Sequence, residues 1–524
     1  MATPILLTTL NATYQHCAFG LRYLYANMAE LQAETAIEEF TRDQNPQDIA
    51  EKLLAHHPKL IGFGVYIWNT RETRNVIACL KRIKPELVIV LGGPEVSYEA
   101  ENQSICQLAD FIFAGESDFL FPQFCREYLR EGKLPSGKMI SGPLPEIKQI
   151  ALPYAFYSDE DLRHRVLYVE ASRGCPYQCE FCLSSLDKAV RSFDLDRFLG
   201  AMEVLITRGA RQFKFVDRTF NLSVATSTRI LSFFLERIHH GLFLHFEMVP
   251  DRLPAELRSL IRQFPPGSLQ FEIGIQTWTP DVAKLVSRRL DYPKIRENFA
   301  FLNETGVHLH ADLIVGLPGE TLQTFAAGFD QVTALGPHEV QVGILKRLKG
   351  TPIIRHDAAW GMVYADEPPF QILQTRTLDF VTLQSLNRFS KFWDLYANRG
   401  NFPHFMRLLR ELSLQHHPPS LFAEFYAFSE FLSRRHLQRH SLALLSLVES
   451  AWVYLTQERK LDPVRAREIL IQDYTGSVKR DIPRFLRAET SELPLVSTKR
   501  LANNATPRRQ NRHLSQGEAQ GSAS

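Results

Sequence analysis

The chain has 524 residues, 45% hydrophobic and 23% charged, a composition typical of globular proteins with more than one core. Its 60 basic and 58 acidic residues leave a net charge of +2, so no global nucleic-acid or membrane surface is indicated. No apolar run reaches the roughly 18 residues of a membrane helix, and the first ten residues lack the pattern of a signal peptide. Seven cysteines, an odd number, argue against a disulfide framework. We therefore expect a cytoplasmic protein with no membrane partner and no clear nucleic-acid partner.

The first third of the chain alternates short apolar runs with amphipathic segments. Strands are expected at residues 4–10, 36–40, 60–68, 87–92 and 111–114. Apolar residues at helical spacing predict helices over residues 46–56 and 70–83. Because strand–helix–strand repeats pair in parallel, we expect an α/β domain with a flavodoxin-like, doubly wound parallel sheet over residues 1–140.

Ligands of such sheets bind at the carboxyl ends of the strands. The residues expected there, which we take as candidates for cofactor binding, are Tyr66, Trp68, Gly92, Gly93, Glu95, Gly115 and Glu116. Glycines at these ends let a large flat ligand approach the backbone. The alternative is ordinary turn chemistry in a sheet without a cofactor.

After a linker over residues 141–160, six strand–helix units are expected between residues 161 and 370. The strands are predicted at residues 166–171, 212–216, 242–249, 268–275, 307–315 and 339–345. The helices are predicted at residues 196–208, 223–239, 254–263, 292–305 and 321–335.

The rest of the chain reads as a helical domain over residues 371–485 followed by a tail over residues 486–524. Aromatic residues are dense in the helical part, which favours a packed core over the wall of a substrate pocket. The tail is rich in Asn, Arg, Gln, Ser and Gly and is expected to be disordered.

Three cysteines, Cys175, Cys179 and Cys182, stand in the run Ala-Ser-Arg-Gly-Cys-Pro-Tyr-Gln-Cys-Glu-Phe-Cys-Leu. A four-iron cluster usually takes four thiolates, so a trio predicts a 4Fe-4S cluster with one iron open to a small molecule. The other four cysteines share no ligand-like spacing. A three-cysteine zinc site completed by a histidine is the alternative.

This spacing, with the aromatic Phe181 before the last cysteine, resembles the signature of radical S-adenosylmethionine (radical SAM) proteins. The resemblance implies a central partial (β/α)6 barrel and an open iron that holds S-adenosylmethionine. It also implies a 5′-deoxyadenosyl radical that takes hydrogen from the substrate, which is chemistry carried by the cofactor.

Several strand-end residues match the pattern of that family. The resemblance implies that Asp217, Glu247 and Gln276 face the methionine part or the ribose, and that the segment of Asp312 and Gly316 lies against the adenine. The alternative for Asp312, Glu247 and Gln276 is structural hydrogen bonding in the barrel mouth. The second strand lacks the glycine-glycine-glutamate-proline run of many relatives.

The amino-terminal domain, placed before the radical SAM cysteines, resembles the cobalamin-binding module of cobalamin-dependent radical enzymes. It departs from the histidine-ligating form, because Tyr14 stands where that form has an aspartate and Gly20 is one residue too far from His16. The resemblance therefore implies a cobalamin without a histidine lower ligand.

Together these resemblances identify the chain as a radical SAM protein with a cobalamin-binding domain and an extra carboxyl-terminal helical domain. They imply an enzyme that transfers a methyl group to, or rearranges, a substrate that the sequence does not name. An external electron donor such as a flavodoxin or ferredoxin is expected, and no catalytic side chain is predicted. Two alternatives stay open: a methylthiotransferase-like enzyme, and a non-catalytic iron–sulfur protein that senses cobalamin or redox state.

Overall fold

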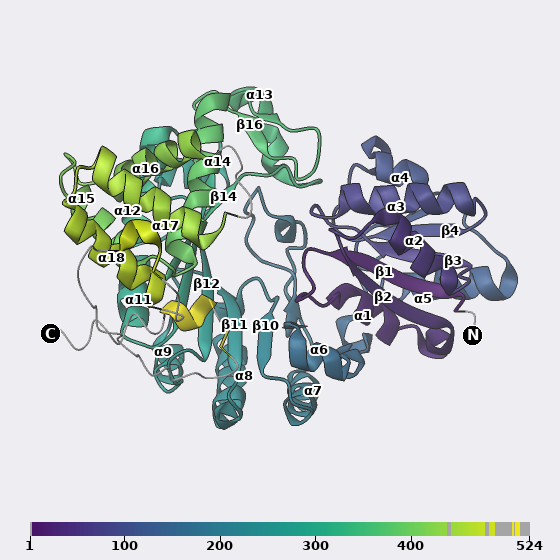
Figure 1. Cartoon of the computed structure of the whole chain (residues 1–524). Coiled ribbons are helices and arrows are strands. Elements are labelled where there is room, and N and C mark those ends of the chain that lie inside the picture. The colour runs from purple at the N-terminus through teal and green to yellow at the C-terminus, as the bar shows by residue number, and fades with distance from the viewer. Residues whose placement is uncertain (1–2, 437–441, 477–481, 488–505, 508, 514–524) are drawn as a thin grey trace. The chain divides into compact units, whose positions relative to one another are not determined.

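The computed structural model describes residues 3–436, 442–476, 482–487, 506–507 and 509–513 of the chain, which is drawn in Figure 1. The chain forms two compact units. The first unit comprises Met1–Thr219, Lys346–Arg355 and Tyr364–Gln371. The second unit comprises Phe220–Leu345, His356–Val363 and Ile372–Ser524. The domain boundaries proposed from the sequence stay predictions. None of the helices in the described residues has both the length and the apolar character needed to cross a membrane.

The first unit contains a parallel sheet of six strands in the order β2-β1-β3-β4-β5-β6. These strands are β1 (Ile5–Asn11), β2 (Thr35–Thr41), β3 (Leu60–Gly64), β4 (Val88–Gly92), β5 (Phe111–Phe113) and β6 (Met139–Ile140). β1 pairs in parallel with both β2 and β3, so the strand order reverses between β1 and β3. The predicted flavodoxin-like sheet is confirmed, and only the two-residue strand β6 was too short to be seen in the sequence pattern.

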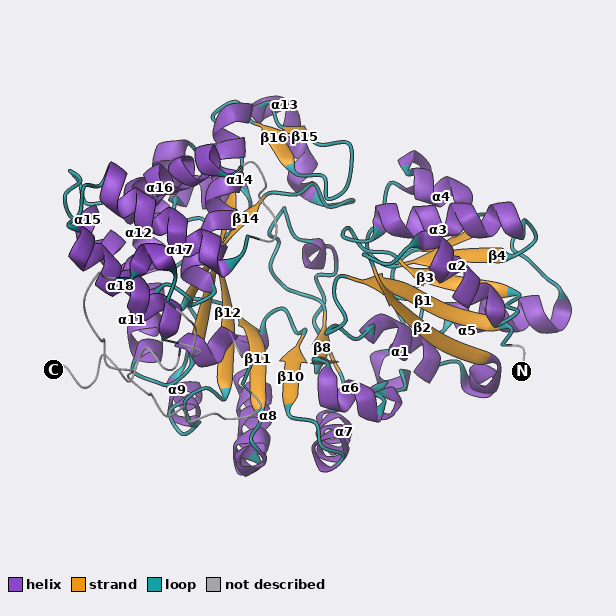
Figure 2. Cartoon of the chain, in the orientation of Figure 1, coloured by secondary structure: helices purple, strands orange, loops and turns teal. Residues whose placement is uncertain are grey.

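Helices cover both faces of this sheet (Figure 2). They are α1 (Phe19–Ala26), α2 (Pro46–Ala55), α3 (Thr70–Ile83), α4 (Ser104–Leu108) and α5 (Leu120–Arg126). Side chains of α2, α3 and α4 pack with one face of the strands in one apolar core. Side chains of α1 and α5 pack with the opposite face in a second core. Burial of apolar residues on alternate sides of each strand therefore produces the doubly wound arrangement.

The first unit also holds the beginning of the second α/β region. Its elements are α6 (Asp159–His164), β7 (Leu167–Val169), α7 (Leu195–Thr207) and β10 (Gln212–Phe215). β7 and β10 pair in parallel. Between them lies a small antiparallel hairpin of β8 (Ser172–Arg173) and β9 (Arg191–Ser192), which encloses the three cysteines of the motif.

The second unit contains four further parallel strands, paired in the order β11-β12-β13-β14. They are β11 (Phe243–Met248), β12 (Leu269–Gln276), β13 (His308–Val315) and β14 (Glu339–Ile344). The helices that accompany them are α8 (Val224–Glu236), α9 (Ala255–Ile261), α10 (Pro280–Leu285), α11 (Tyr292–Asn303) and α12 (Leu322–Ala334). All six strands that the sequence predicts for the second α/β region are thus present, and each is followed by a helix or a loop in the expected order.

The carboxyl-terminal part of the second unit is helical. Its elements are α13 (Asp357–Trp360), α14 (Phe380–Trp393), α15 (Pro403–Ser413), α16 (Leu421–Arg435), α17 (Leu444–Val453) and α18 (Pro463–Thr475), while the short strands β15 (Val363–Tyr364) and β16 (Ile372–Gln374) precede α14. The aromatic side chains of this region are mostly buried, and Phe389 packs against Trp393, Phe422 and Phe425. The prediction that these aromatic residues form a core is confirmed.

Part of the tail that was predicted to be disordered packs on the second unit. The side chain of Arg509 contacts Glu339 at 2.6 Å and Asp394 at 3.0 Å, and Thr506 donates to the carbonyl oxygen of Gly267 at 2.8 Å. For this short segment the prediction is wrong, because composition does not register ion pairs with distant residues. Residues 488–505, 508 and 514–524 of the same prediction lie outside the described residues.

Candidate functional site

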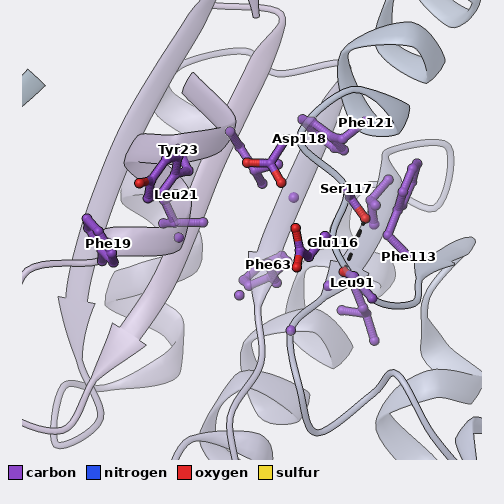
Figure 3. Close-up of a pocket in the computed structure, with 18 of the residues that line it drawn as sticks. Phe19, Leu21, Tyr23, Phe63, Leu91, Phe113, Glu116, Ser117, Asp118 and Phe121 are labelled. Atoms are coloured by element: carbon purple, nitrogen blue, oxygen red, sulfur yellow. Dashed lines mark hydrogen bonds between the residues drawn. The ribbon is translucent and has the colours of Figure 1, made fainter. Parts of the chain in front are cut away.

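A cavity of about 350 Å³ opens at the carboxyl ends of β3, β4 and β5. Of the residues predicted there, Tyr66, Gly92, Gly93, Gly115 and Glu116 line it. Apolar side chains from α1, β5 and α5 form part of its wall, as Phe19, Leu21, Phe113 and Phe121 in Figure 3 illustrate. The cavity lies beside the point where the strand order reverses, which is the usual ligand site of an open α/β sheet.

Glycines keep this cavity open. A Cβ atom added at Gly92 or Gly115 would have no other atom within 4 Å, so both positions border free space. Gly93 has a φ of +110°, and a Cβ atom there would lie 2.5 Å from the carbonyl oxygen of Val65. A flat ligand can therefore approach the backbone at Gly92 and Gly115, while Gly93 is needed for the turn itself.

A buried side chain holds the loop after β3 in place through hydrogen bonds. The side chain of Asn69, which is fully buried, donates to Thr9 Oγ1 at 3.1 Å and to the Leu10 carbonyl oxygen at 3.0 Å. Its carbonyl oxygen accepts from the Tyr66 N–H at 2.8 Å. Asn69 thus ties β1 to β3, and the sequence pattern gave no sign of this role because it depends on a contact 60 residues away.

Two of the predicted residues stand beside the cavity and do not line it. Trp68 stacks on Tyr66 with ring centroids 4.4 Å apart and is 42% exposed. Glu95 is only 2% exposed, and burial raises the pKa of its carboxyl to about 7 despite the nearby Lys349. Glu95 is therefore a buried carboxyl, and its predicted contact with a cofactor stays a prediction.

His16 makes its contacts with residues that do not line the cavity. Its Nδ1 atom lies 2.5 Å from the Tyr168 hydroxyl, and its backbone pairs with Val166. Burial is the main cause that lowers the pKa of its imidazole. The expectation that His16 is not a lower ligand of cobalt stays a prediction.

The cysteine loop follows β8, the first strand of the β8–β9 hairpin. Gly174 has a φ of +91°, and a side chain there would collide with the carbonyl oxygen of Ala189 across the neck of the loop. The N–H of Cys175 donates to the Asp187 carbonyl oxygen at 2.9 Å, which closes the same neck. Cys175 and Cys179 are buried, whereas Cys182 and the adjoining Phe181 are half-buried.

The three thiols are close enough for their charges to interact. Burial raises the pKa of the Cys175 thiol, and the neighbouring Cys182 and Cys179 raise it further. Within the described part of the chain, no group of three or more His, Cys, Asp or Glu side chains converges as ligands of a single metal ion do. The preference for an iron–sulfur cluster over a zinc site rests on the spacing of the three cysteines.

Asp217 closes the base of the cysteine loop. It accepts hydrogen bonds from the Ser172 hydroxyl at 2.6 Å and from the Ala171 N–H at 3.0 Å. Burial raises the pKa of its carboxyl to about 7, against the effect of these hydrogen bonds. Both carboxylate oxygens are thus occupied, and the predicted contact of Asp217 with S-adenosylmethionine stays a prediction.

The remaining candidates, Glu247, Gln276, Asp312 and Gly316, lie in the second unit. β12 and β13 place Gly274 beside Asp312, and a bulge at the end of β12 gives Gln276 a φ of +71°. A Cβ atom on Gly274 would lie 2.6 Å from Nε2 of Gln276, so the glycine makes room for that side chain. A non-glycine residue in this strained conformation is a common feature of functional sites.

A row of polar residues crosses the same sheet; the sequence predicts Glu247 as a site residue, whereas Glu272 and His310 were missed. The strand register sets Glu247 beside Glu272 and Glu272 beside His310. Burial lowers the pKa of His310, but the Asp312 carboxylate 3.2 Å away and the other nearby carboxylates raise it overall. Polar residues at every second position of β11, β12 and β13 were the available signal, because alternation places them on one face.

Three family models match separate parts of the chain. Residues 5–124 match the B12 binding domain, residues 169–331 match the radical SAM superfamily, and residues 358–519 match a protein of unknown function (DUF4080). The two predicted domain families are confirmed, and the helical region corresponds to the third model.

Curated relatives are distant. An uncharacterized methyltransferase from Pyrococcus horikoshii is 23% identical over 59% of this chain and 71% of its own length. A 2-(S-pantetheinyl)-carbapenam-3-carboxylate methyltransferase from Streptantibioticus cattleyicolor is 24% identical over 62% of this chain, and the match spans only 53% of that relative. A tRNA-2-methylthio-N(6)-dimethylallyladenosine synthase from Acinetobacter baumannii is 23% identical over 52% of this chain and 59% of its own length.

Two solved structures share the fold at low identity. The radical SAM methyltransferase TsrM from Kitasatospora setae is 17% identical, with a TM-score of 0.56 over 72% of this chain and 79% of its own. The cobalamin-dependent radical enzyme OxsB is 12% identical, with a TM-score of 0.60 over 90% of this chain and 79% of its own. The family models thus show an amino-terminal B12 binding domain followed by a radical SAM domain, and the two solved structures share the fold of the chain.

Proposed function

We propose that this protein is a cobalamin-dependent radical SAM methyltransferase, which transfers a methyl group to a carbon atom of its substrate. The observation that supports this most directly is that two residues next to the cysteine loop also line the cavity. Glu170 and Arg173, which lead into the cysteine loop, also line the glycine-rich cavity of the B12 binding domain. A cluster on the loop and a corrin in the cavity would therefore be neighbours within one compact unit.

The residues of the chain divide into three sets by the group that each would hold. Cys175, Cys179 and Cys182 would bind iron, and Phe181 directly precedes Cys182 in the sequence. Tyr66, Gly92, Gly93 and Gly115 would face the corrin. The strand-end residues Glu247, Gln276, Asp312 and Gly316 would contact S-adenosylmethionine.

Bound together, these groups supply a carbon radical and a transferable methyl group. The chain itself orients the groups and excludes water. Phe113 and Phe121 give the cavity an apolar floor, and the narrow neck at Gly174 and Asp187 fixes the cysteine loop. We also propose that an external flavodoxin or ferredoxin supplies the electron.

Anaerobic reconstitution of the full chain tests this function. We expect about four irons per chain, as in a 4Fe-4S protein, and a corrin spectrum that survives gel filtration after incubation with hydroxocobalamin. After reduction, both 5′-deoxyadenosine and S-adenosylhomocysteine should form from S-adenosylmethionine. 5′-Deoxyadenosine alone would favour a rearrangement, and the absence of both products would favour a non-catalytic sensor.

The methylthiotransferase alternative is weaker. The sequence shows no second cysteine trio, and the upstream cysteines lie in different places: Cys106 belongs to one core of the first sheet and Cys125 to the other. Labelled sulfur in a reaction product would nevertheless identify that chemistry.

A further inference from the structure

The hairpin that carries the cysteine loop presents two arginines side by side. In the antiparallel pair of β8 and β9, Arg173 stands directly opposite Arg191. Like charges directly opposite each other weaken a strand pair unless an anion lies between them. The side chains are only 13% and 17% exposed, so solvent does little to screen this repulsion.

Glu116 supplies the anion for both arginines. Its Oε2 atom lies 2.8 Å from Nη1 of Arg173, and its Oε1 atom forms a very short ion pair with Arg191. Glu116 comes from the loop after β5, in the B12 binding domain. One carboxylate therefore bridges the two strands that flank the cysteine loop.

Further carboxylates hold each arginine in place. Arg173 also contacts Asp118 and Glu170, each at 2.9 Å, and its guanidinium lies 4.5 Å from the ring centre of Tyr23. Arg191 contacts Asp187 at 3.0 Å, within the cysteine loop itself. The planar fork of arginine suits such multiple carboxylate contacts, which a lysine cannot reproduce.

The same group of residues forms one end of the cavity. Glu116, Asp118, Glu170 and Arg173 all line it, and Figure 3 shows Glu116 and Asp118 between the α1 side chains and Phe113. Arg173 is two residues before Cys175 in the chain. A ligand that touches this end of the cavity therefore meets side chains that are anchored to the cysteine loop.

We propose that Arg173 and Arg191, bridged by Glu116, are positioning residues that couple the occupancy of the cavity to the geometry of the cysteine loop. This inference rests on the proposed function, since it takes the ligand to be a corrin and the loop to hold the cluster. The arginines act through Glu116 and need not touch either reacting group.

The test uses the reconstituted full chain and compares the electron paramagnetic resonance spectrum of the reduced cluster with and without hydroxocobalamin. We expect the corrin to change this spectrum in the wild-type protein. With each variant saturated with hydroxocobalamin, Glu116→Gln, Arg191→Lys and Arg173→Lys should keep their iron while the spectral change is lost or reduced severalfold. Arg191 does not line the cavity, so Arg191→Lys should also keep the wild-type affinity for the corrin. Arg208→Lys, an arginine paired with the exposed Asp159, is the matched control and should behave as wild type.

A corrin-dependent change that is the same in the three variants and the wild type would overturn the inference, and so would a wild-type spectrum that does not respond to bound corrin. If Arg173→Lys does not fold, Arg191→Lys and Glu116→Gln still decide the result. Wild-type protein that binds iron but no corrin contradicts the proposed function instead. In that case the midpoint potential of the cluster tests whether Arg173 and Arg191 position the cysteine loop. A potential that is the same in wild type, Glu116→Gln and Arg191→Lys would overturn the inference.

Discussion

Arg355 forms an ion pair with Glu180, the residue that follows Cys179, across 175 positions of the chain. The Glu180 side chain is 3% exposed and that of Arg355 is 60% exposed, so the carboxylate is the buried partner. The Ile353 N–H also donates to the Glu180 carbonyl oxygen at 3.0 Å. A distant segment of the chain thus holds the cysteine loop at its middle.

Arg355→Ala should loosen the cysteine loop. Removing a charged hydrogen-bond donor from a buried carboxylate costs on the order of 1–3 kcal/mol. We expect urea unfolding at a lower concentration and faster loss of iron to a chelator. Arg130→Ala, which removes an ion pair at an exposed site, is the control, because surface ion pairs contribute little. Equal iron loss in both variants would contradict a holding role for Arg355.

Cys179→Ala should abolish cluster binding without unfolding the protein. The thiolate would be one of three iron ligands, and a cluster with two protein ligands is not retained. Iron analysis and the visible absorption spectrum check this, while circular dichroism checks the fold. Cys79→Ala, a half-buried cysteine outside the motif, should keep its iron. Unchanged iron in Cys179→Ala would refute the site.

Gly92→Ala and Gly93→Ala should separate ligand binding from folding. A methyl group on Gly92 meets open space in the cavity, so this variant should fold normally and bind hydroxocobalamin more weakly. A methyl group on Gly93 meets the Val65 carbonyl oxygen at an unfavourable φ, which costs on the order of 1–3 kcal/mol or more.

Thermal unfolding and a corrin titration measure the two effects. Tight corrin binding by a folded Gly92→Ala protein would mean that the ligand does not use this part of the cavity. A Gly93→Ala protein as stable as wild type would contradict the conformational argument.

Glu95 should make the protein less stable as the pH rises. Burial raises the pKa of its carboxyl to about 7, above the ordinary value of 4.5, so the folded state holds the proton more tightly than the unfolded state does. The resulting stabilisation is complete below about pH 4.5 and is lost as the pH rises through about 7. It amounts to about 3 kcal/mol at most.

Urea unfolding of wild type and Glu95→Gln between pH 5 and pH 8 measures this contribution. The variant should lack part of the pH dependence and should be more stable than wild type at pH 8. Glu101→Gln, at an exposed position of the same loop, is the control. Parallel curves for wild type and Glu95→Gln would show that Glu95 titrates normally.

The sequence by itself determined the order and type of most elements. The helix α3 has the predicted bounds, because its apolar residues Val76, Ile77 and Leu80 repeat at helical spacing and face one core. The alternation of strands and helices was equally visible, since burial against a sheet imposes its own period on the sequence. The cysteine trio was readable because its ligands lie within one short loop.

The tertiary structure alone decided what several polar side chains do. Glu116 and Glu95 both follow strand ends, yet the first bridges two arginines and the second is buried without a cationic contact of that kind. Asp217 closes the base of the cysteine loop, and Arg509 packs on Glu339 from the tail. Each of these roles depends on residues far away in the chain, and hydrophobic periodicity, which is local, carries no information about such contacts.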